Sequence, residues 1–262
     1  MLPRSIPILE GLASAVGKGR SCKEVAAASQ GRNHEGGQTM DFRDSIARVR
    51  QENLTYISTA RLQLLTSKLI ETLEAGVAGH VLEFGIALGG SGTLLAKGAV
   101  AHQRHFHGFD VFAMIPPPTS EKDDENSKKR YNQIKSGKSK GIGGEKYYGY
   151  RENLFDEVTQ SFARHGIPVN GETVVFHKGL FEETWPSYQD GKVAFAHIDC
   201  DWYDPVAFCL RAVADLMPSG GCVILDDYDA YGGCRTATLE FLEQRQDFSQ
   251  GEGEQARILR KL

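Results

Sequence analysis

Two runs of the sequence end in carboxylates in a way that indicates a metal site. The run 197–205 carries Asp199, and the run 223–228 carries Asp226 and Asp227. Each begins with apolar, β-prone residues typical of a buried strand, and the carboxyl ends of strands in an open α/β sheet face the ligand crevice. Buried carboxylates need a neutralising cation, and hard oxygen ligands suit Mg²⁺. We therefore expect Asp199, Asp226 and Asp227 to bind Mg²⁺ together, although any one of them alone would be read as a helix cap or a solvated turn residue.

A glycine-rich turn at residues 83–91 predicts a second kind of binding site. Glycines at this position allow a tight turn and close approach to a ligand, which meets the free N–H groups of the following helix. Gly85, Gly89 and Gly90 do not have the G-x-G-x-x-G spacing of dinucleotide sites. Glu83, just ahead of the first glycine, suits the ammonium group of S-adenosylmethionine. The alternative is an ordinary glycine-rich turn with Glu83 solvated.

The ends of the next two expected strands extend this donor site. Asp110 lies 25 residues after Gly85, where an acidic side chain can bind both hydroxyls of a ribose. NAD and S-adenosylmethionine share that ribose, so the choice of the methyl donor depends on Glu83 and the glycine spacing. At 177–181, Gly179 and Phe181 can line an adenine pocket, or they can simply close a strand and pack in the core.

Composition excludes several function classes. The 262 residues are 40% hydrophobic and 24% charged with a net charge of −4, which favours neither nucleic acid nor an anionic membrane surface as a partner. No apolar run approaches the roughly 20 residues of a membrane span. The five cysteines are scattered without a CxxC pair and are expected to be reduced thiols: Cys22, Cys200, Cys209, Cys222 and Cys234. We expect a cytoplasmic homo-oligomer.

Helix and strand patterns alternate along most of the chain. Expected helices are a leucine-striped segment at 62–73 with Ser58 or Thr59 as its cap, then 93–101, 153–164, 205–217 and 235–245. Expected strands are 80–85, 106–110, 173–177, 193–199, 222–225 and a last one around 258–259. Asp204 is expected to cap the helix that has Pro205 at its first position. This alternation predicts an α/β fold with a doubly wound, mostly parallel sheet.

The same patterns divide the chain into segments. Residues 1–40 are expected to be a flexible N-terminal segment, 41–78 a helical cap and 79–262 the core. Within the core, 113–150 is too long for an ordinary connection and is expected to be a lid or a solvated loop. Its lysines could meet an anionic substrate group or remain solvated: Lys135, Lys138, Lys140 and Lys146.

These motifs together resemble a known family. Glu83-x-Gly85-x-x-x-Gly89-Gly90-Ser91, Ile198-Asp199-x-Asp201-x-Tyr203 and Leu225-Asp226-Asp227-Tyr228 are similar to the motifs of macrocin-type (TylF-like) sugar O-methyltransferases. The resemblance runs from about Leu54 to the C-terminus and does not cover the first 40 residues or the glycine- and lysine-rich segment. It implies a Rossmann-like class I methyltransferase fold, a bound Mg²⁺ on Asp199, Asp226 and Asp227, and methylation of a sugar hydroxyl. It also implies a donor site at Glu83, Gly85, Ser91 and Asp110.

The general base is left among three candidates. Catechol-type methyltransferases, which look similar at the metal, have a lysine three residues after the first aspartate, where this chain has Trp202. Asp199, Asp201 and His197 remain. We expect both Asp199 and Asp201 to take part in catalysis, Asp199 as base and metal ligand and Asp201 by contacting the substrate or the metal ligands. His197 is expected to be a hydrogen-bonded core histidine.

The expected reaction is transfer of a methyl group from S-adenosylmethionine to a hydroxyl of a small-molecule sugar or polyol in natural-product or glycan biosynthesis. A vicinal diol is favoured because two adjacent oxygens can chelate one Mg²⁺. A nicotinamide-dependent sugar oxidoreductase, or methylation of a cyclitol, is the alternative.

Overall fold

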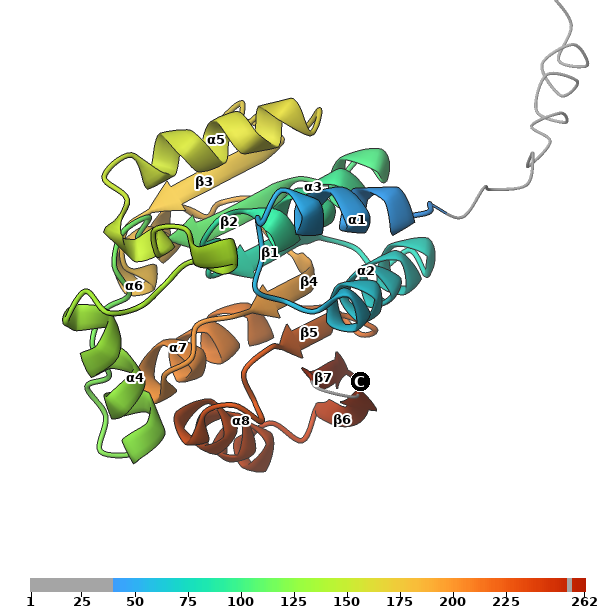
Figure 1. The fold of residues 1–262 in the computed structure, drawn as a ribbon. Coiled ribbons are helices and arrows are strands. Elements are labelled where there is room, and N and C mark those ends of the chain that lie inside the picture. Colours follow the sequence, from blue (N-terminus) through green and yellow to red (C-terminus); the bar gives the residue numbers. More distant parts are fainter. Residues whose placement is uncertain (1–39, 254–255) are drawn as a thin grey trace, which may run out of the picture. The chain divides into compact units, whose positions relative to one another are not determined.

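A seven-stranded sheet forms the centre of the protein in the computed structural model, which describes residues 40–253 and 256–262. Its strands are β1 His80–Phe84, β2 Phe106–Asp110, β3 Val174–Lys178, β4 Val193–Ile198, β5 Cys222–Leu225, β6 Phe248–Gly253 and β7 Ala256–Lys261. The order is β3-β2-β1-β4-β5-β7-β6 (Figure 1). The first five strands are parallel, and β7 is antiparallel to both β5 and β6.

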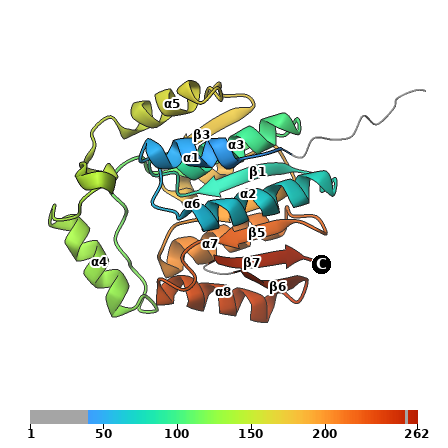
Figure 2. The same ribbon diagram turned by 45° about the vertical axis from the view of Figure 1, so that its right-hand side comes forward.

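Helices cover both faces of this sheet (Figure 2). The helices of the described residues are α1 Arg43–Gln51, α2 Thr59–Glu74, α3 Gly90–Ala101, α4 Glu125–Lys135, α5 Leu154–Arg164, α6 Phe181–Thr184, α7 Tyr203–Ala214 and α8 Gly232–Gln244, with short 3₁₀ turns at Ile142–Gly144, Tyr148–Tyr150 and Trp185–Ser187. One apolar core joins a sheet face to α2, α3 and α5, and the other joins the opposite face to α6, α7 and α8. α1 packs against α2 and α3, and α4 contacts α8. The two cores follow from strand alternation, because successive side chains point to opposite faces.

Several local expectations are confirmed. Ser58 caps α2 by accepting the N–H of Arg61, as its residue type predicts. The strands 106–110 and 222–225 have the expected bounds. The four described cysteines, from Cys200 to Cys234, are free thiols. The expected flexible segment 1–40 and Cys22 lie, apart from Met40, outside the described residues. None of the described helices has the length and apolar character to cross a bilayer.

Other boundaries differ from expectation. α7 begins at Tyr203 with Trp202 as its N-cap residue, rather than at Pro205 with Asp204 as cap. The Asp204 carboxylate instead accepts the hydroxyl of Thr119, 2.7 Å away. β6 was not expected, and it exists because it pairs with β7 along its whole length. The 113–150 segment contains a regular helix, α4, where none was expected.

Candidate active site

The ends of β4 and β5 bring the predicted metal ligands together. The N–H of Asp199 donates to the Phe84 carbonyl at 2.9 Å, and that of Asp226 donates to the Ile198 carbonyl at 3.0 Å. These bonds continue the parallel pairing just past the strand ends. As a result, one carboxylate oxygen from each of Asp199, Asp226 and Asp227 lies within 4.8 Å of the others.

Charge repulsion at this point is strong. Burial raises the pKa of Asp199 well above its usual range, and the neighbouring Asp227 carboxylate raises it further. The same two causes, in the same order, raise the pKa of Asp201. Asp201 also has φ of 60°, in the left-handed region that is uncommon for a residue with a side chain. Carboxylates held this close stay ionised only where a cation neutralises them.

Arg61 supplies part of the positive charge. From the first turn of α2, its Nε donates to Asp226 Oδ1 at 3.0 Å and its Nη2 donates to the Asp226 backbone carbonyl at 2.8 Å. The Arg61 and Asp226 side chains are 22% and 8% exposed, so this ion pair is largely shielded from solvent.

The remaining carboxylates fit a divalent cation. Asp227 Oδ2 is buried and has no hydrogen-bond partner among the described residues. A buried oxygen without a donor is costly, and a metal ion would satisfy it. An all-oxygen set of three aspartates matches the ligands that Mg²⁺ takes in proteins, where it keeps part of its water shell.

The glycine-rich turn lies directly beside this cluster. Gly85 has φ of 95°, and a Cβ at this position would lie 2.0 Å from the Asp199 carbonyl oxygen, so only glycine fits. Asp110 holds the turn: its Oδ2 accepts the N–H groups of Ile86 at 2.7 Å and Ala87 at 3.0 Å. Its Oδ1 accepts the N–H of Phe112 at 2.6 Å.

Glu83 lies in the protein core rather than at the surface of a cavity. It is fully buried, and its Oε1 lies 2.9 Å from Nδ1 of His197, which is itself 1% exposed. A Cβ on Gly92 would lie 2.5 Å from Glu83 Oε2, so the carboxylate packs against the first turn of α3. His197 is the hydrogen-bonded core histidine that the sequence predicts. Glu83 lines neither of the two cavities described next.

Two adjoining cavities open beside the carboxylates. The first, which we call the apolar cavity, has a volume of about 360 Å³ and is lined by Leu180, Phe181 and Trp202 among others. The second, the carboxylate cavity, has about 250 Å³ and contains Ser91, Asp201 and the three predicted metal ligands. Their linings share Gly85, Ile115, Asp110, Tyr148 and Asp199. Of the expected donor-site residues, Gly179 and Glu83 are absent from both linings.

The 113–150 segment forms part of both cavity walls. Tyr148 and Ile115 line both, while Tyr147 and Arg130 line the carboxylate cavity. The four lysines expected to meet an anionic group are all exposed and line neither cavity. Arg130, in α4, is the cation that this segment contributes instead.

Sequence reasoning missed the cations and aromatic residues of the carboxylate cavity. Arg61 and Arg130 stand on helices whose other residues gave no functional signal. Tyr56, Tyr147, Tyr148 and Tyr231 complete the lining. The Tyr147-Tyr148-Gly149-Tyr150 run is the one local pattern that could have indicated a ring-lined pocket.

The sheet order, the antiparallel β7 and the site at the carboxyl ends of the strands define a class I methyltransferase fold. Among solved structures, the O-methyltransferase NovP has 22% sequence identity and a TM-score of 0.66, over 82% of this chain and 87% of NovP. The calicheamicin methyltransferase CalS11 has 16% identity and a TM-score of 0.60, over 86% and 98%. An O-methyltransferase from Bacillus cereus in complex with SAH has 13% identity and a TM-score of 0.53, over 92% and 96%.

Residues 21–249 match the family described as macrocin-O-methyltransferase (TylF), and the chain belongs to this family. It is an S-adenosylmethionine-dependent O-methyltransferase, and the expected fold class and family are confirmed. No curated protein matches the sequence significantly. Family membership favours the methyl donor over the nicotinamide cofactor of the alternative interpretation.

Proposed function

We propose that this enzyme transfers a methyl group from S-adenosylmethionine to a hydroxyl of a sugar or sugar-like diol, in a reaction that depends on Mg²⁺. The observation that carries the proposal is the convergence of Asp199, Asp226 and Asp227 within 4.8 Å, beside a cavity bordered by the glycine-rich turn. The family's description as macrocin-O-methyltransferase and the calicheamicin methyltransferase among the structural neighbours support a natural-product sugar as acceptor.

The donor is assigned to the glycine-rich turn and the wall next to it. Gly85 and Ser91 offer close backbone approach and the N-terminus of α3, where free N–H groups bind polar ligand atoms. Asp110, at the end of β2, borders both cavities and is assigned to accept ribose hydroxyls. Phe181 gives the apolar cavity an aromatic wall assigned to adenine, and Gly179 lies two residues before it.

Mg²⁺ is assigned to Asp199, Asp226 and Asp227. When bound, it would lower the pKa of an acceptor hydroxyl and hold two neighbouring hydroxyls in one orientation. The Asp199 carboxylate is assigned to take the hydroxyl proton as the new O–C bond forms and the methyl–sulfur bond breaks. Asp201, in the same cavity, is assigned to bind the acceptor.

The 113–150 segment is proposed to cover the bound acceptor. Its Tyr147 and Tyr148 line the carboxylate cavity, and aromatic rings pack well against the apolar faces of sugars. The exclusion of water from the cavity would favour methyl transfer over side reactions.

Transfer of isotopically labelled methyl groups to a panel of glycosides tests the proposal. Each vicinal diol is compared with its two mono-deoxy analogues and with a cyclitol, in Mg²⁺ and in EDTA. We expect labelling of the vicinal-diol glycosides in preference to their mono-deoxy analogues and to the cyclitol, its loss in EDTA and its recovery when Mg²⁺ is restored. Asp227→Asn should abolish labelling, whereas Asp229→Asn, an exposed neighbour paired with Arg235, should not. Equal labelling of diols and mono-deoxy analogues would refute the chelation of a diol by the metal. Preferential labelling of the cyclitol would show that the acceptor is a cyclitol rather than a sugar.

A further inference from the structure

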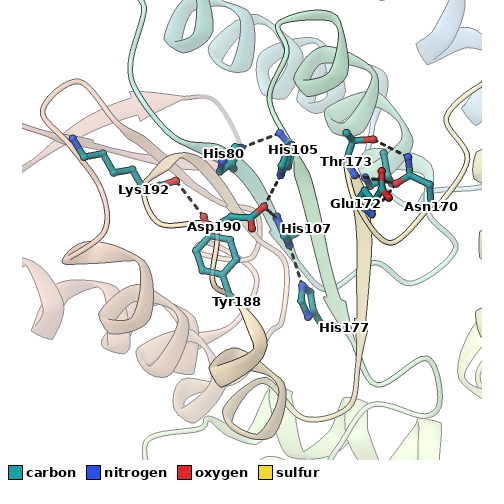
Figure 3. A network of polar contacts seen from close by, with 11 residues as sticks. His80, His105, His107, Asn170, Glu172, Thr173, His177, Tyr188, Asp190 and Lys192 are labelled. Atoms are coloured by element: carbon teal, nitrogen blue, oxygen red, sulfur yellow. Dashed lines mark hydrogen bonds and ion pairs between the residues drawn. The ribbon is translucent and has the colours of Figure 1, made fainter. Parts of the chain in front are cut away.

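Four of the eight histidines gather around one aspartate on the face of the sheet that packs against α6 and α7 (Figure 3). They are His80, His105, His107 and His177, and the aspartate is Asp190. His80 is the first residue of β1, and His105 immediately precedes β2. Because Val81 pairs with Phe106, these two histidines lie side by side, and their rings stack with centroids 4.4 Å apart. This group lies at the amino ends of β1 and β2, away from the carboxylates that follow β4 and β5.

Asp190 is the centre of the group. Its Oδ2 lies 2.5 Å from Nδ1 of His105 and 3.0 Å from Nε2 of His107. His80 completes the inner set, since one of its ring nitrogens lies within 4.8 Å of the ligand atoms of both His105 and Asp190. Two imidazoles and one carboxylate thus converge from β1, the residue before β2 and the loop before β4.

We propose that His80, His105 and Asp190 form a binding site for a divalent transition-metal ion such as Zn²⁺, separate from the methyl-transfer site. Imidazole nitrogen and carboxylate oxygen are ordinary Zn²⁺ ligands, and three protein ligands leave a fourth position for water. Imidazoles are poor ligands for Mg²⁺, which prefers oxygen. The enzyme therefore carries two sites of different chemistry, and the all-carboxylate one is the site suited to Mg²⁺.

Buried neighbours hold the aspartate in place, as outer hydrogen-bond partners do in metal sites. His107 is 4% exposed and contacts His177 at 3.0 Å between Nδ1 and Nε2, and His177 Nδ1 lies 2.7 Å from the Ser187 hydroxyl. This chain of contacts leads from Asp190 through the buried His107 and His177 to the exposed Ser187 and fixes the orientation of the His107 ring. His107 therefore orients Asp190 without itself belonging to the inner set.

The inner set is open to solvent on its other side. His80 and His105 are partly exposed and Asp190 is exposed, so an ion can enter without unfolding of the chain. Zn²⁺ would bind between His105 Nδ1 and Asp190, and the proton of the neutral His105 ring would then stand on Nε2. The backbone N–H of His105, which donates to His80 Nδ1 at 2.9 Å, holds the two rings together in the absence of metal.

The consequence of binding is stabilisation rather than catalysis. Asp110, at the far end of β2, is about five residues and so roughly 16 Å away along the strand. A bound ion would tie the starts of β1 and β2 to the loop that carries Asp190, and ligands that bind only the folded state raise its stability. The proposal does not depend on the identity of the methyl acceptor.

Metal titration of the full chain, made without a histidine tag and stripped with chelator, tests the site. With excess Mg²⁺ present to occupy the carboxylate site, we expect one equivalent of Zn²⁺ to bind and to raise the thermal midpoint, and Co²⁺ to give visible absorption bands of a site with nitrogen ligands. His105→Ala and Asp190→Ala should each weaken Zn²⁺ binding by more than about 100-fold, beyond the roughly 10- to 100-fold effect of losing an outer partner such as His107.

Matched variants locate the bound ion. His102→Ala removes a histidine whose Nδ1 contacts the Gly98 carbonyl outside the group, and Asp227→Ala removes a ligand of the proposed Mg²⁺ site. Both should keep full Zn²⁺ affinity and the thermal shift. Absence of Zn²⁺ binding, or binding that survives His105→Ala and Asp190→Ala in variants with a native circular dichroism spectrum, would overturn the proposal.

Discussion

Arg61 donates hydrogen bonds to both the carboxylate and the backbone carbonyl of Asp226, and so joins α2 to the end of β5. Arg61→Ala would leave a buried carboxylate beside Asp199 and Asp227 without its cation. We expect a loss of about 1–3 kcal/mol of stability in EDTA and a larger stabilisation by Mg²⁺ than in the wild type. Thermal unfolding with and without Mg²⁺ measures both.

Arg43→Ala serves as the control for this substitution, because Arg43 and Asp41 form an exposed pair of side chains 82% and 53% exposed. It should have almost no effect. If Arg61→Ala is no more sensitive to Mg²⁺ than Arg43→Ala, Arg61 does not contribute to the charge balance of the site.

The buried pair of Glu83 and His197 predicts a stability effect of a different kind. Removal of one partner of a buried pair typically costs about 3–5 kcal/mol, so His197→Ala should sharply lower the denaturant midpoint. Glu83→Gln keeps a hydrogen-bonding oxygen and should cost less. Titration with S-adenosylhomocysteine then separates two possible roles of Glu83. If Glu83 only positions the glycine-rich turn, both variants should bind S-adenosylhomocysteine more weakly than the wild type. If Glu83 binds the donor directly, only Glu83→Gln should bind it more weakly.

Strand ends were predictable from the sequence because two local signals coincide there. Apolar, β-prone runs ending in Asp110, Asp199 and Asp226 specify both a buried strand and a polar end, and the parallel sheet then places these ends at one edge. α4 and β6 lack such signals. α4 is polar apart from Ile134, and depends on Asp124, which accepts the N–H groups of Ser127 at 2.8 Å and Gly232 at 2.9 Å.

Long-range contacts explain the remaining differences. β6 has no apolar alternation and is a strand because β7 pairs with it. Arg61 belongs to the site through a contact across 165 residues, which no spacing in the sequence reveals. Glu83 shows the same limit: its position before the glycines predicts a ligand of the donor, while its buried contact with His197 across β1 and β4 is one that no spacing in the sequence reveals.

Closure of the 113–150 segment over bound ligands predicts protection from protease. Lys138 and Lys140 are exposed, whereas Tyr147 and Tyr148 nearby line the carboxylate cavity. Trypsin should cut the free protein near these lysines, and S-adenosylhomocysteine with Mg²⁺ and a diol should slow the cut several-fold. Cleavage at Lys192, which lies outside both cavity linings, provides the internal reference. Equal slowing at both places, or none at Lys138 and Lys140, would argue against a cover.

His107 predicts a loss of stability in acid. Burial lowers the pKa of this imidazole from 6.5 to about 4. Between these pH values the unfolded chain binds a proton that the folded protein does not, so stability falls as the pH is lowered through this window. The loss should reach about 3 kcal/mol at most. Urea denaturation at pH 7 and pH 4.5 should show a smaller drop for His107→Gln than for the wild type or His102→Gln, and identical drops would exclude His107 as the cause.

The magnesium assignment is tested most directly by the binding of Mn²⁺, a paramagnetic substitute for Mg²⁺, followed by electron paramagnetic resonance. We expect one Mn²⁺ per chain that excess Mg²⁺ displaces, with binding lost in Asp227→Ala and retained in Asp190→Ala, which disables only the proposed histidine site. Mn²⁺ binding that persists in Asp227→Ala but disappears in Asp190→Ala, or no binding at all to the wild type, would contradict a metal ion on Asp199, Asp226 and Asp227.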